Sequence, residues 1–173
     1  MQFFSGFSLQ NEEHFFSDIL DESSYCVAGF SYGAIKALRY ARKCLQEGQR
    51  IDRVQLLSPA FFQTKGEKFK QLQLRGFKRD KEQYLQAFLG LCFTPYDVQG
   101  VQTVEVTSNE LEELLYYEWS VADLVELSAR GVEIEVYLGG EDKIVDAQAA
   151  REFFRDCATV TYIKHANHFL QTS

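Results

Sequence analysis

The sequence predicts an α/β fold built on a mostly parallel sheet. Strand-like apolar runs alternate with helical patterns near both ends of the chain, and parallel strands need such helical crossovers to connect them. A glycine-flanked serine, Gly29-Phe30-Ser31-Tyr32-Gly33, stands at one change from strand to helix. With 173 residues and 46% hydrophobic content, the chain can bury one core without disulfides. We therefore expect a single domain over residues 1–173.

The pentapeptide has the pattern G-x-S-x-G and the context of a nucleophile elbow. The apolar run Tyr25-Cys26-Val27-Ala28 precedes it as a buried strand would. A helical pattern follows, with Ala34, Ile35 and Leu38 on one face and Gly48 as its stop. The turn between such elements is too tight for side chains at the glycine positions, and it projects the serine above the sheet. Ser31 is the candidate nucleophile; its structural alternative is a small residue in a glycine turn.

Residues 1–58 are predicted to alternate strand, helix, strand, helix, strand. Residues 60–106 break this alternation, because they are aromatic-rich and amphipathic, with Pro95 marking a bend. Thr107 and Glu110 have capping-box spacing, which predicts the start of a helical stretch that continues to Ala129. An insertion at about residues 60–115 is thus expected to form a small helical cap, which could provide an acyl pocket or only a subdomain with its own core.

A carboxylate and a histidine follow in the order that a serine nucleophile of this type requires. The strand pattern 132–138 ends at Gly139-Gly140-Glu141-Asp142, so its carboxylates lie at the edge of the sheet where ligands bind. A helical pattern over 147–157 and a last strand over 159–163 lead to His165 and His168. Asp142 is the preferred acid, since Asp146 directly precedes the helix and suits an N-cap.

Of the two histidines, His168 is the preferred base. The apolar pair Phe169-Leu170 follows it and can anchor its loop, whereas His165 follows Lys164 at the strand end and is expected to be solvated. The H-x-x-H spacing also admits a metal site, but two histidines without a third nearby ligand make a poor zinc site. We expect no metal.

Composition bears on the compartment of the protein and on the classes of partner it could bind. The four cysteines show neither metal nor disulfide spacing, which suits reduced thiols in the cytoplasm. Met1 leads directly into a strand-like segment, so no export signal is expected. No apolar run approaches the ~20 residues that a membrane span needs. The net charge of −7 argues against general nucleic-acid binding.

Charge is distributed unevenly along this acidic chain. Between Lys65 and Glu82 there are seven basic and three acidic residues, a local net charge of +4. On a helix, Arg75, Lys78 and Arg79 would share one face. Such a stripe is either a solvated face or a docking surface for an acidic partner.

These motifs resemble those of the α/β-hydrolases, and specifically the pimeloyl-[acyl-carrier-protein] methyl ester esterases of biotin synthesis in their short BioV type. Ser5-Gly6-Phe7-Ser8 stands where that family has its oxyanion loop, with Ser5 in place of the usual histidine. The elbow, acid loop and histidine loop match at 29–33, 139–145 and 164–170. The chain begins at the oxyanion strand, so the family's first two strands are expected to be absent, and little of the usual final helix follows His168.

The resemblance implies a carboxylesterase with the triad Ser31, His168 and Asp142 and no cofactor. Its oxyanion hole would be formed by the backbone N–H groups of Phe7 and Tyr32. The implied substrate is the methyl ester of pimeloyl-ACP. An acyl carrier protein (ACP) is strongly acidic, so the basic residues become candidate carrier contacts: Arg75, Lys78, Arg79, Lys68 and Lys70. Two alternatives remain open, a general short-acyl esterase or thioesterase and a catalytically silent acyl-binding protein of the same fold.

Overall fold

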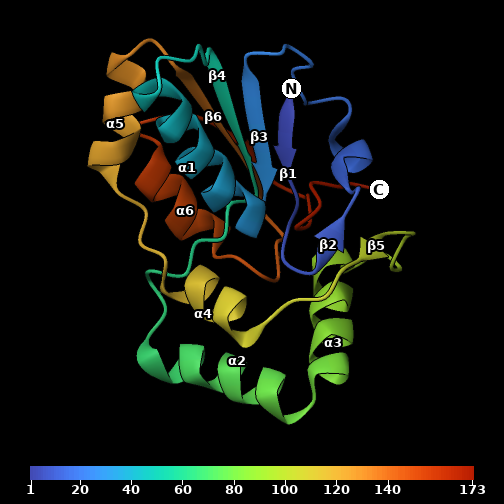
Figure 1. Cartoon of the computed structure of the whole chain (residues 1–173). Coiled ribbons are helices and arrows are strands. Elements are labelled where there is room, and N and C mark those ends of the chain that lie inside the picture. Colours follow the sequence, from blue (N-terminus) through green and yellow to red (C-terminus); the bar gives the residue numbers. More distant parts are fainter.

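A five-stranded parallel sheet forms the centre of the molecule in the computed structural model, which describes residues 1–173 (Figure 1). Every neighbouring pair of strands in this sheet is parallel, as predicted. In spatial order the strands are β1 (Gln2–Phe4), β3 (Cys26–Phe30), β4 (Arg53–Leu57), β6 (Glu133–Gly139) and β7 (Thr159–Ile163).

Three helices cover one face of the sheet: α1 (Tyr32–Gln46), α5 (Val121–Ala129) and α6 (Ala147–Phe154) (Figure 1). Alternate side chains of the central strands divide between two cores, because successive strand residues point to opposite faces. Val54 and Leu56 of β4 pack beneath these helices, whereas Leu57 joins an aromatic cluster with Phe16 and Phe169. Both faces of β3 and β4 are therefore buried, as a parallel sheet requires.

The first predicted helix is wrong. Between β1 and β3 the chain forms only the two-residue strand β2 (Leu9–Gln10) and a short 3-10 helix, Glu13–Phe16. Ser8 and Asn11 adopt positive φ values of 63° and 60°, a conformation that interrupts regular structure. This segment is consequently a folded loop rather than a crossover helix.

The segment between β4 and β6 contains α2 (Glu67–Arg79), α3 (Lys81–Phe93), the short strand β5 (Gln102–Thr103) and α4 (Ser108–Tyr116). Figure 1 shows α2, α3 and α4 beyond the carboxyl ends of the sheet strands. β5 pairs antiparallel with β2, which ties this segment back to the loop after β1. No helix of the structure combines the length and apolar character needed to cross a membrane.

The helical stretch expected from Thr107 to Ala129 is two helices. The capping box is present, since the Thr107 hydroxyl accepts from the Glu110 amide at 3.3 Å and the Glu110 carboxylate from the Thr107 amide at 2.8 Å. The chain then becomes extended after Tyr116, and the Ser120 hydroxyl caps α5. Trp119, in the break, is buried and donates its indole N–H to the Ala60 carbonyl at 2.8 Å. This tertiary anchor outweighs the local tendency to continue the helix.

Candidate active site

Ser31 lies in the turn between β3 and α1 with φ 54° and ψ −114°, a strained conformation for a non-glycine residue. The glycines on either side make this turn possible. A Cβ atom on Gly29 would lie 2.2 Å from the Gly33 carbonyl oxygen, and one on Gly33 would lie 1.9 Å from the Phe4 carbonyl oxygen. Both approaches are far below van der Waals contact. The pentapeptide therefore forms the elbow that its sequence predicted.

A continuous hydrogen-bonded chain joins Ser31, His168 and Asp142. The Ser31 Oγ atom lies 3.0 Å from His168 Nε2, and His168 Nδ1 lies 2.6 Å from Asp142 Oδ2. The histidine is fully buried and the Asp142 side chain is 1% exposed. Because a carboxylate only accepts, Nδ1–H must donate to it, and Nε2 of the neutral ring is then free to accept from the serine hydroxyl.

The acid loop holds Asp142 through its second oxygen. Asp142 Oδ1 accepts hydrogen bonds from the amides of Ile144 at 2.7 Å and Val145 at 2.9 Å. The loop also packs backbone to backbone on the histidine loop, because a Cβ on Gly139 would lie 2.3 Å from the Asn167 carbonyl oxygen. These contacts orient one carboxylate oxygen toward the loop and the other toward His168.

Asp146 has a different position, at the start of α6. Its carboxylate accepts from the Ala149 amide at 3.0 Å, which is an N-cap contact. We expect Asp146→Ala to lower the free energy of unfolding by about 1 kcal/mol, because the helix loses that partner. Ester hydrolysis should be largely retained. Denaturant unfolding and a p-nitrophenyl ester assay test this; a large loss of kcat with unchanged stability would contradict it.

Packing below the histidine loop fixes His168. The ring of Phe169 stacks on Phe93 with centroids 4.2 Å apart, as anticipated for an anchoring residue. His165, in contrast, is exposed and pairs with Glu141 at 3.0 Å, so it takes no part in the buried chain. The two histidines of the H-x-x-H pattern are thus used separately. No group of three or more potential metal-ligating His, Cys, Asp or Glu side chains occurs in the structure.

Sequence reasoning missed two buried residues that support these loops. The Ser58 hydroxyl, at the end of β4, donates to the His168 carbonyl at 2.7 Å. Its position after the strand next to that of Ser31 was the available signal, since adjacent parallel strands end at the same edge. Glu12 is fully buried and accepts from the Gly6 amide at 2.6 Å. Nothing in its polar surroundings in the sequence indicated burial.

The two amides predicted to form an oxyanion hole have no hydrogen-bond acceptor within the protein. Tyr32 is the first residue of α1, where an amide has no partner inside the helix. Phe7 lies in the loop after β1, and its amide makes none of the loop hydrogen bonds. Both groups are therefore available to another acceptor.

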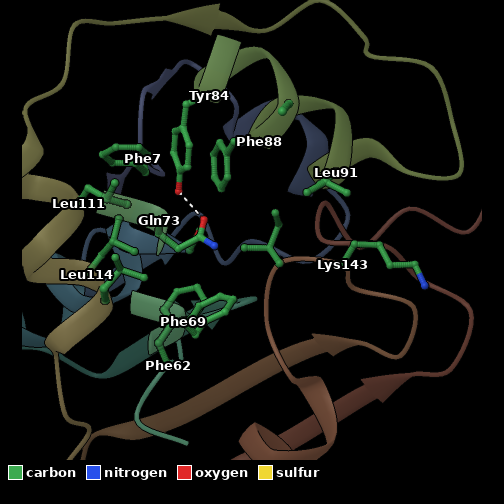
Figure 2. Close-up of a pocket in the computed structure, with 14 residues that line it drawn as sticks. Phe7, Phe62, Phe69, Gln73, Tyr84, Phe88, Leu91, Leu111, Leu114 and Lys143 are labelled. Atoms are coloured by element: carbon green, nitrogen blue, oxygen red, sulfur yellow. Dashed lines mark hydrogen bonds between the residues drawn. The ribbon is translucent and has the colours of Figure 1, made fainter. Parts of the chain in front are cut away.

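Ser31 opens onto an apolar cavity of about 230 Å³ between the sheet edge and helices α2, α3 and α4. Figure 2 shows its aromatic and aliphatic lining and the Lys143 ammonium pointing away from it. Across the cavity, the Tyr84 hydroxyl donates to Gln73 at 2.9 Å, which links α3 to α2. Burial raises the pKa of Tyr84 to about 12, so this donor stays protonated. Eleven of the 14 lining residues are hydrophobic, and the cavity suits an aliphatic chain.

Tyr32, beside the nucleophile, connects α1 to the helices over the cavity. Its hydroxyl donates to Glu113 of α4 at 2.6 Å, and Arg39 of α1 pairs with the same carboxylate. Burial, together with the Glu113 contact, raises the pKa of the Tyr32 phenol well above its ordinary value. This partly buried contact holds α4 over the turn that carries Ser31.

Four of the five basic residues proposed as carrier contacts are exposed on α2 and form no ion pair within the protein: Lys68, Arg75, Lys78 and Arg79. Lys70 differs from them. It is only 9% exposed, and its Nζ atom lies 4.8 Å from the centroid of the Tyr116 ring. Lys70 is therefore committed to packing between α2 and α4 and does not belong to the free surface.

Comparison with known proteins identifies the fold. No protein-family model matches the sequence, and no curated protein sequence matches it. Among solved structures, an esterase from Exiguobacterium antarcticum superposes with a TM-score of 0.63 at 16% identity, covering 82% of this chain and 58% of its own. The chain has the α/β-hydrolase fold. The predicted fold class is thus confirmed, with this chain spanning less than two thirds of that esterase.

Two further solved structures align over most of this chain and most of their own. E-2-(Acetamidomethylene)succinate hydrolase has a TM-score of 0.56 at 15% identity, covering 97% of this chain and 84% of its own. BioG from Haemophilus influenzae also has a TM-score of 0.56, at 10% identity, covering 98% of this chain and 88% of its own. At such identities the likeness concerns the fold, and chemistry must be argued from the site.

Proposed function

We propose that this α/β-hydrolase is a serine ester hydrolase with Ser31, His168 and Asp142 as its catalytic triad. The observation that carries the proposal is the buried chain of hydrogen bonds from Ser31 Oγ to Asp142, which begins at the elbow and faces an apolar cavity. Ordinary serine is a weak nucleophile, and a positioned imidazole is the usual means of activating it.

The reaction would proceed in two steps through an acyl-enzyme. Ser31 Oγ attacks the ester carbonyl while His168 Nε2 takes its proton, and Asp142 stabilises the resulting imidazolium. The carbonyl oxygen becomes an oxyanion that accepts hydrogen bonds from the amides of Phe7 and Tyr32. His168 returns the proton to the leaving alcohol. A water molecule, deprotonated by the same imidazole, then releases the acid and regenerates Ser31.

The proposed substrate is the methyl ester of pimeloyl-ACP, cleaved to pimeloyl-ACP and methanol in the cytoplasm during biotin synthesis. The short cap with its basic stripe, which resembles that of the pimeloyl-ACP methyl ester esterases, supports this assignment more than the elbow and acid loop, which many hydrolases share. The apolar lining suits a chain of methylene groups, which gains about 0.8 kcal/mol per CH₂ on burial. Helices α2, α3 and α4 would act as the cap through which the carrier presents its acyl group.

The decisive assay is mass spectrometry of methyl pimeloyl-ACP before and after incubation with the protein. We expect loss of the methyl group with the carrier thioester intact. Ethyl and shorter-chain analogues should react more slowly. Cleavage of the thioester would instead identify a thioesterase, equal rates on all esters a general esterase, and no reaction a silent acyl-binding protein.

Carrier recognition gives a separate prediction for α2. Reversing Arg75, Lys78 and Arg79 to glutamate should raise KM for an acyl-ACP ester sharply, because these unpaired cations would face an acidic partner. Hydrolysis of p-nitrophenyl butyrate should change little. Added salt should weaken the wild type on the carrier substrate only, since rim charges are screened within about 10 Å at 0.1 M salt.

A control for net charge reverses three exposed arginines elsewhere, Arg50, Arg130 and Arg155. These arginines contact Asp52, the Leu45 carbonyl and Asp156, so the melting temperature of the control is measured as well. The control should leave KM for the acyl-ACP ester nearly unchanged. If KM for the acyl-ACP ester stays nearly unchanged in the α2 variant as well, the carrier does not dock on α2. Equal rises in KM for the two variants would mean that only net charge matters.

A further inference from the structure

The loop after β1 contains a buried carboxyl group that the triad does not use. Glu12 is fully buried, and its Oε1 atom accepts the Gly6 amide at 2.6 Å across six residues of chain. Its second oxygen, Oε2, is also buried and has no hydrogen-bond partner. Burying a carboxyl group with one oxygen unpaired costs free energy, which the single hydrogen bond from Gly6 only partly offsets. Gly6 directly precedes Phe7, whose amide is one of the two predicted oxyanion donors.

The path of the chain explains why the contact matters. From Gly6 the loop turns through Ser8, runs along β2 and turns again at Asn11, with positive φ at both turns. The Val104 amide donates to the Ser8 carbonyl at 3.0 Å and holds the far side of the loop against the segment at β5. The Glu12 side chain holds the other side of the loop through its hydrogen bond with the Gly6 amide.

Gly6 is the residue that needs this support. Glycine has the widest backbone freedom, so the peptides on both sides of Gly6 need restraint. The Leu9 amide donates to the Gly6 carbonyl at 3.2 Å and holds the peptide that follows, and Glu12 holds the peptide that precedes. The environment of Gly6 also requires glycine, since a Cβ there would lie 2.9 Å from the Phe30 ring. With the Gly6 amide occupied by Glu12, the next amide, that of Phe7, is left without an acceptor inside the protein.

We propose that Glu12 is a positioning residue: by accepting the Gly6 amide it holds the Ser5–Gly6 peptide, and with the Leu9 amide bound to the Gly6 carbonyl on the other side it fixes Gly6 so that the Phe7 N–H faces the oxyanion formed at Ser31. This inference rests on the proposed ester hydrolysis. It gives this chain, whose loop has Ser5 in place of the histidine usual in the family it resembles, a means of its own for ordering the oxyanion loop.

The contact with Gly6 does not depend on the charge of Glu12. Burial raises the pKa of Glu12, although the hydrogen bond from Gly6 acts in the opposite direction. Both the ionised and the neutral carboxyl group have an oxygen that can accept the Gly6 amide. A glutamine at this position should therefore preserve the contact.

The test compares Glu12→Gln, which keeps an acceptor, with Glu12→Met, which has a similar length and no oxygen. Glu13→Ala, a change at the neighbouring partly exposed carboxylate, is the control. With p-nitrophenyl butyrate and active sites counted by fluorophosphonate labelling, Glu12→Met should lower kcat about 10- to 100-fold with KM nearly unchanged, a part of the loss seen when an oxyanion donor is removed. Glu12→Gln and Glu13→Ala should stay close to the wild type.

A trifluoromethyl ketone inhibitor gives a second measurement, because its adduct with Ser31 carries an oxyanion. Glu12→Met should weaken the binding of this inhibitor by the same factor by which it lowers kcat. Should Glu12→Met fail to fold, amide NMR of the wild type and Glu12→Gln decides the matter. The Gly6 amide should be protected from exchange in both proteins, and the Phe7 amide should shift on inhibitor binding.

Three results would overturn the positioning role. One is a Glu12→Met protein whose melting temperature falls while kcat per labelled site stays normal. Another is a Glu12→Gln protein whose kcat is as low as that of Glu12→Met. The third is a Phe7 amide whose chemical shift does not change when the inhibitor binds. A wild type with no Ser31-dependent hydrolysis would instead refute the proposed function, so the two failures are distinguishable.

Discussion

Ser31→Ala should abolish ester hydrolysis while the fold survives. The expected loss of kcat is several orders of magnitude, because triad members act as a unit and no acyl-enzyme can form without the Oγ atom. Stability should change little, since the glycine contacts that shape the elbow involve backbone atoms and remain. The measurements are hydrolysis of p-nitrophenyl butyrate, labelling by a fluorophosphonate probe and the melting temperature.

Ser128→Ala is the matched control for this variant. It makes the same chemical change on the exposed side of α5, away from the cavity. The control should retain full activity and full labelling. Labelling that persists in Ser31→Ala would show that another group is the nucleophile and would refute the triad.

Asp142→Asn should lower kcat by about 10³- to 10⁴-fold. Asparagine has one side-chain acceptor, and the amides of Ile144 and Val145 already require an acceptor at the Oδ1 position. The new NH₂ group would then face His168 Nδ1 and force the proton onto Nε2. In that tautomer the ring cannot accept the proton of Ser31. Because the loop contacts are kept, melting should be nearly unchanged.

Asp146→Asn is the control for the acid, since asparagine caps a helix about as well as aspartate. It should be silent in both activity and stability. The pH dependence of kcat gives a further check on Asp142→Asn. This variant should regain activity at high pH, where hydroxide can replace the missing base. A full-rate Asp142→Asn protein would mean that the 2.6 Å contact to His168 has no catalytic role.

Local sequence signals were sufficient where a residue's conformation depends on its neighbours in the chain. The elbow is such a case, because Gly29 meets Gly33 across a single turn. The N-cap at Asp146 and the capping box at Thr107 depend likewise on contacts three residues away. Chain order also predicted that Asp142 and His168 follow strands of the sheet that carries Ser31.

Local signals failed where a distant contact outweighed them. The pattern from Thr107 to Ala129 favours a single helix, yet Trp119 breaks it by binding the Ala60 carbonyl. The segment before β3 suggested a helix but became a loop paired with β5, a strand more than ninety residues further along the chain. Lys70 shares the helical pattern of its basic neighbours, and only the packing of α4 on α2 buries it.

The sequence by itself determined the α/β fold class, the elbow and the identity of the candidate triad. The reason is that glycine sterics, strand and helix periods and parallel-strand topology act over short range or through chain order. Only the tertiary structure decided that Ser31, His168 and Asp142 meet within hydrogen-bond distance. It also decided that Glu12 and Ser58 support their loops, because burial and long-range hydrogen bonds depend on how separate segments pack.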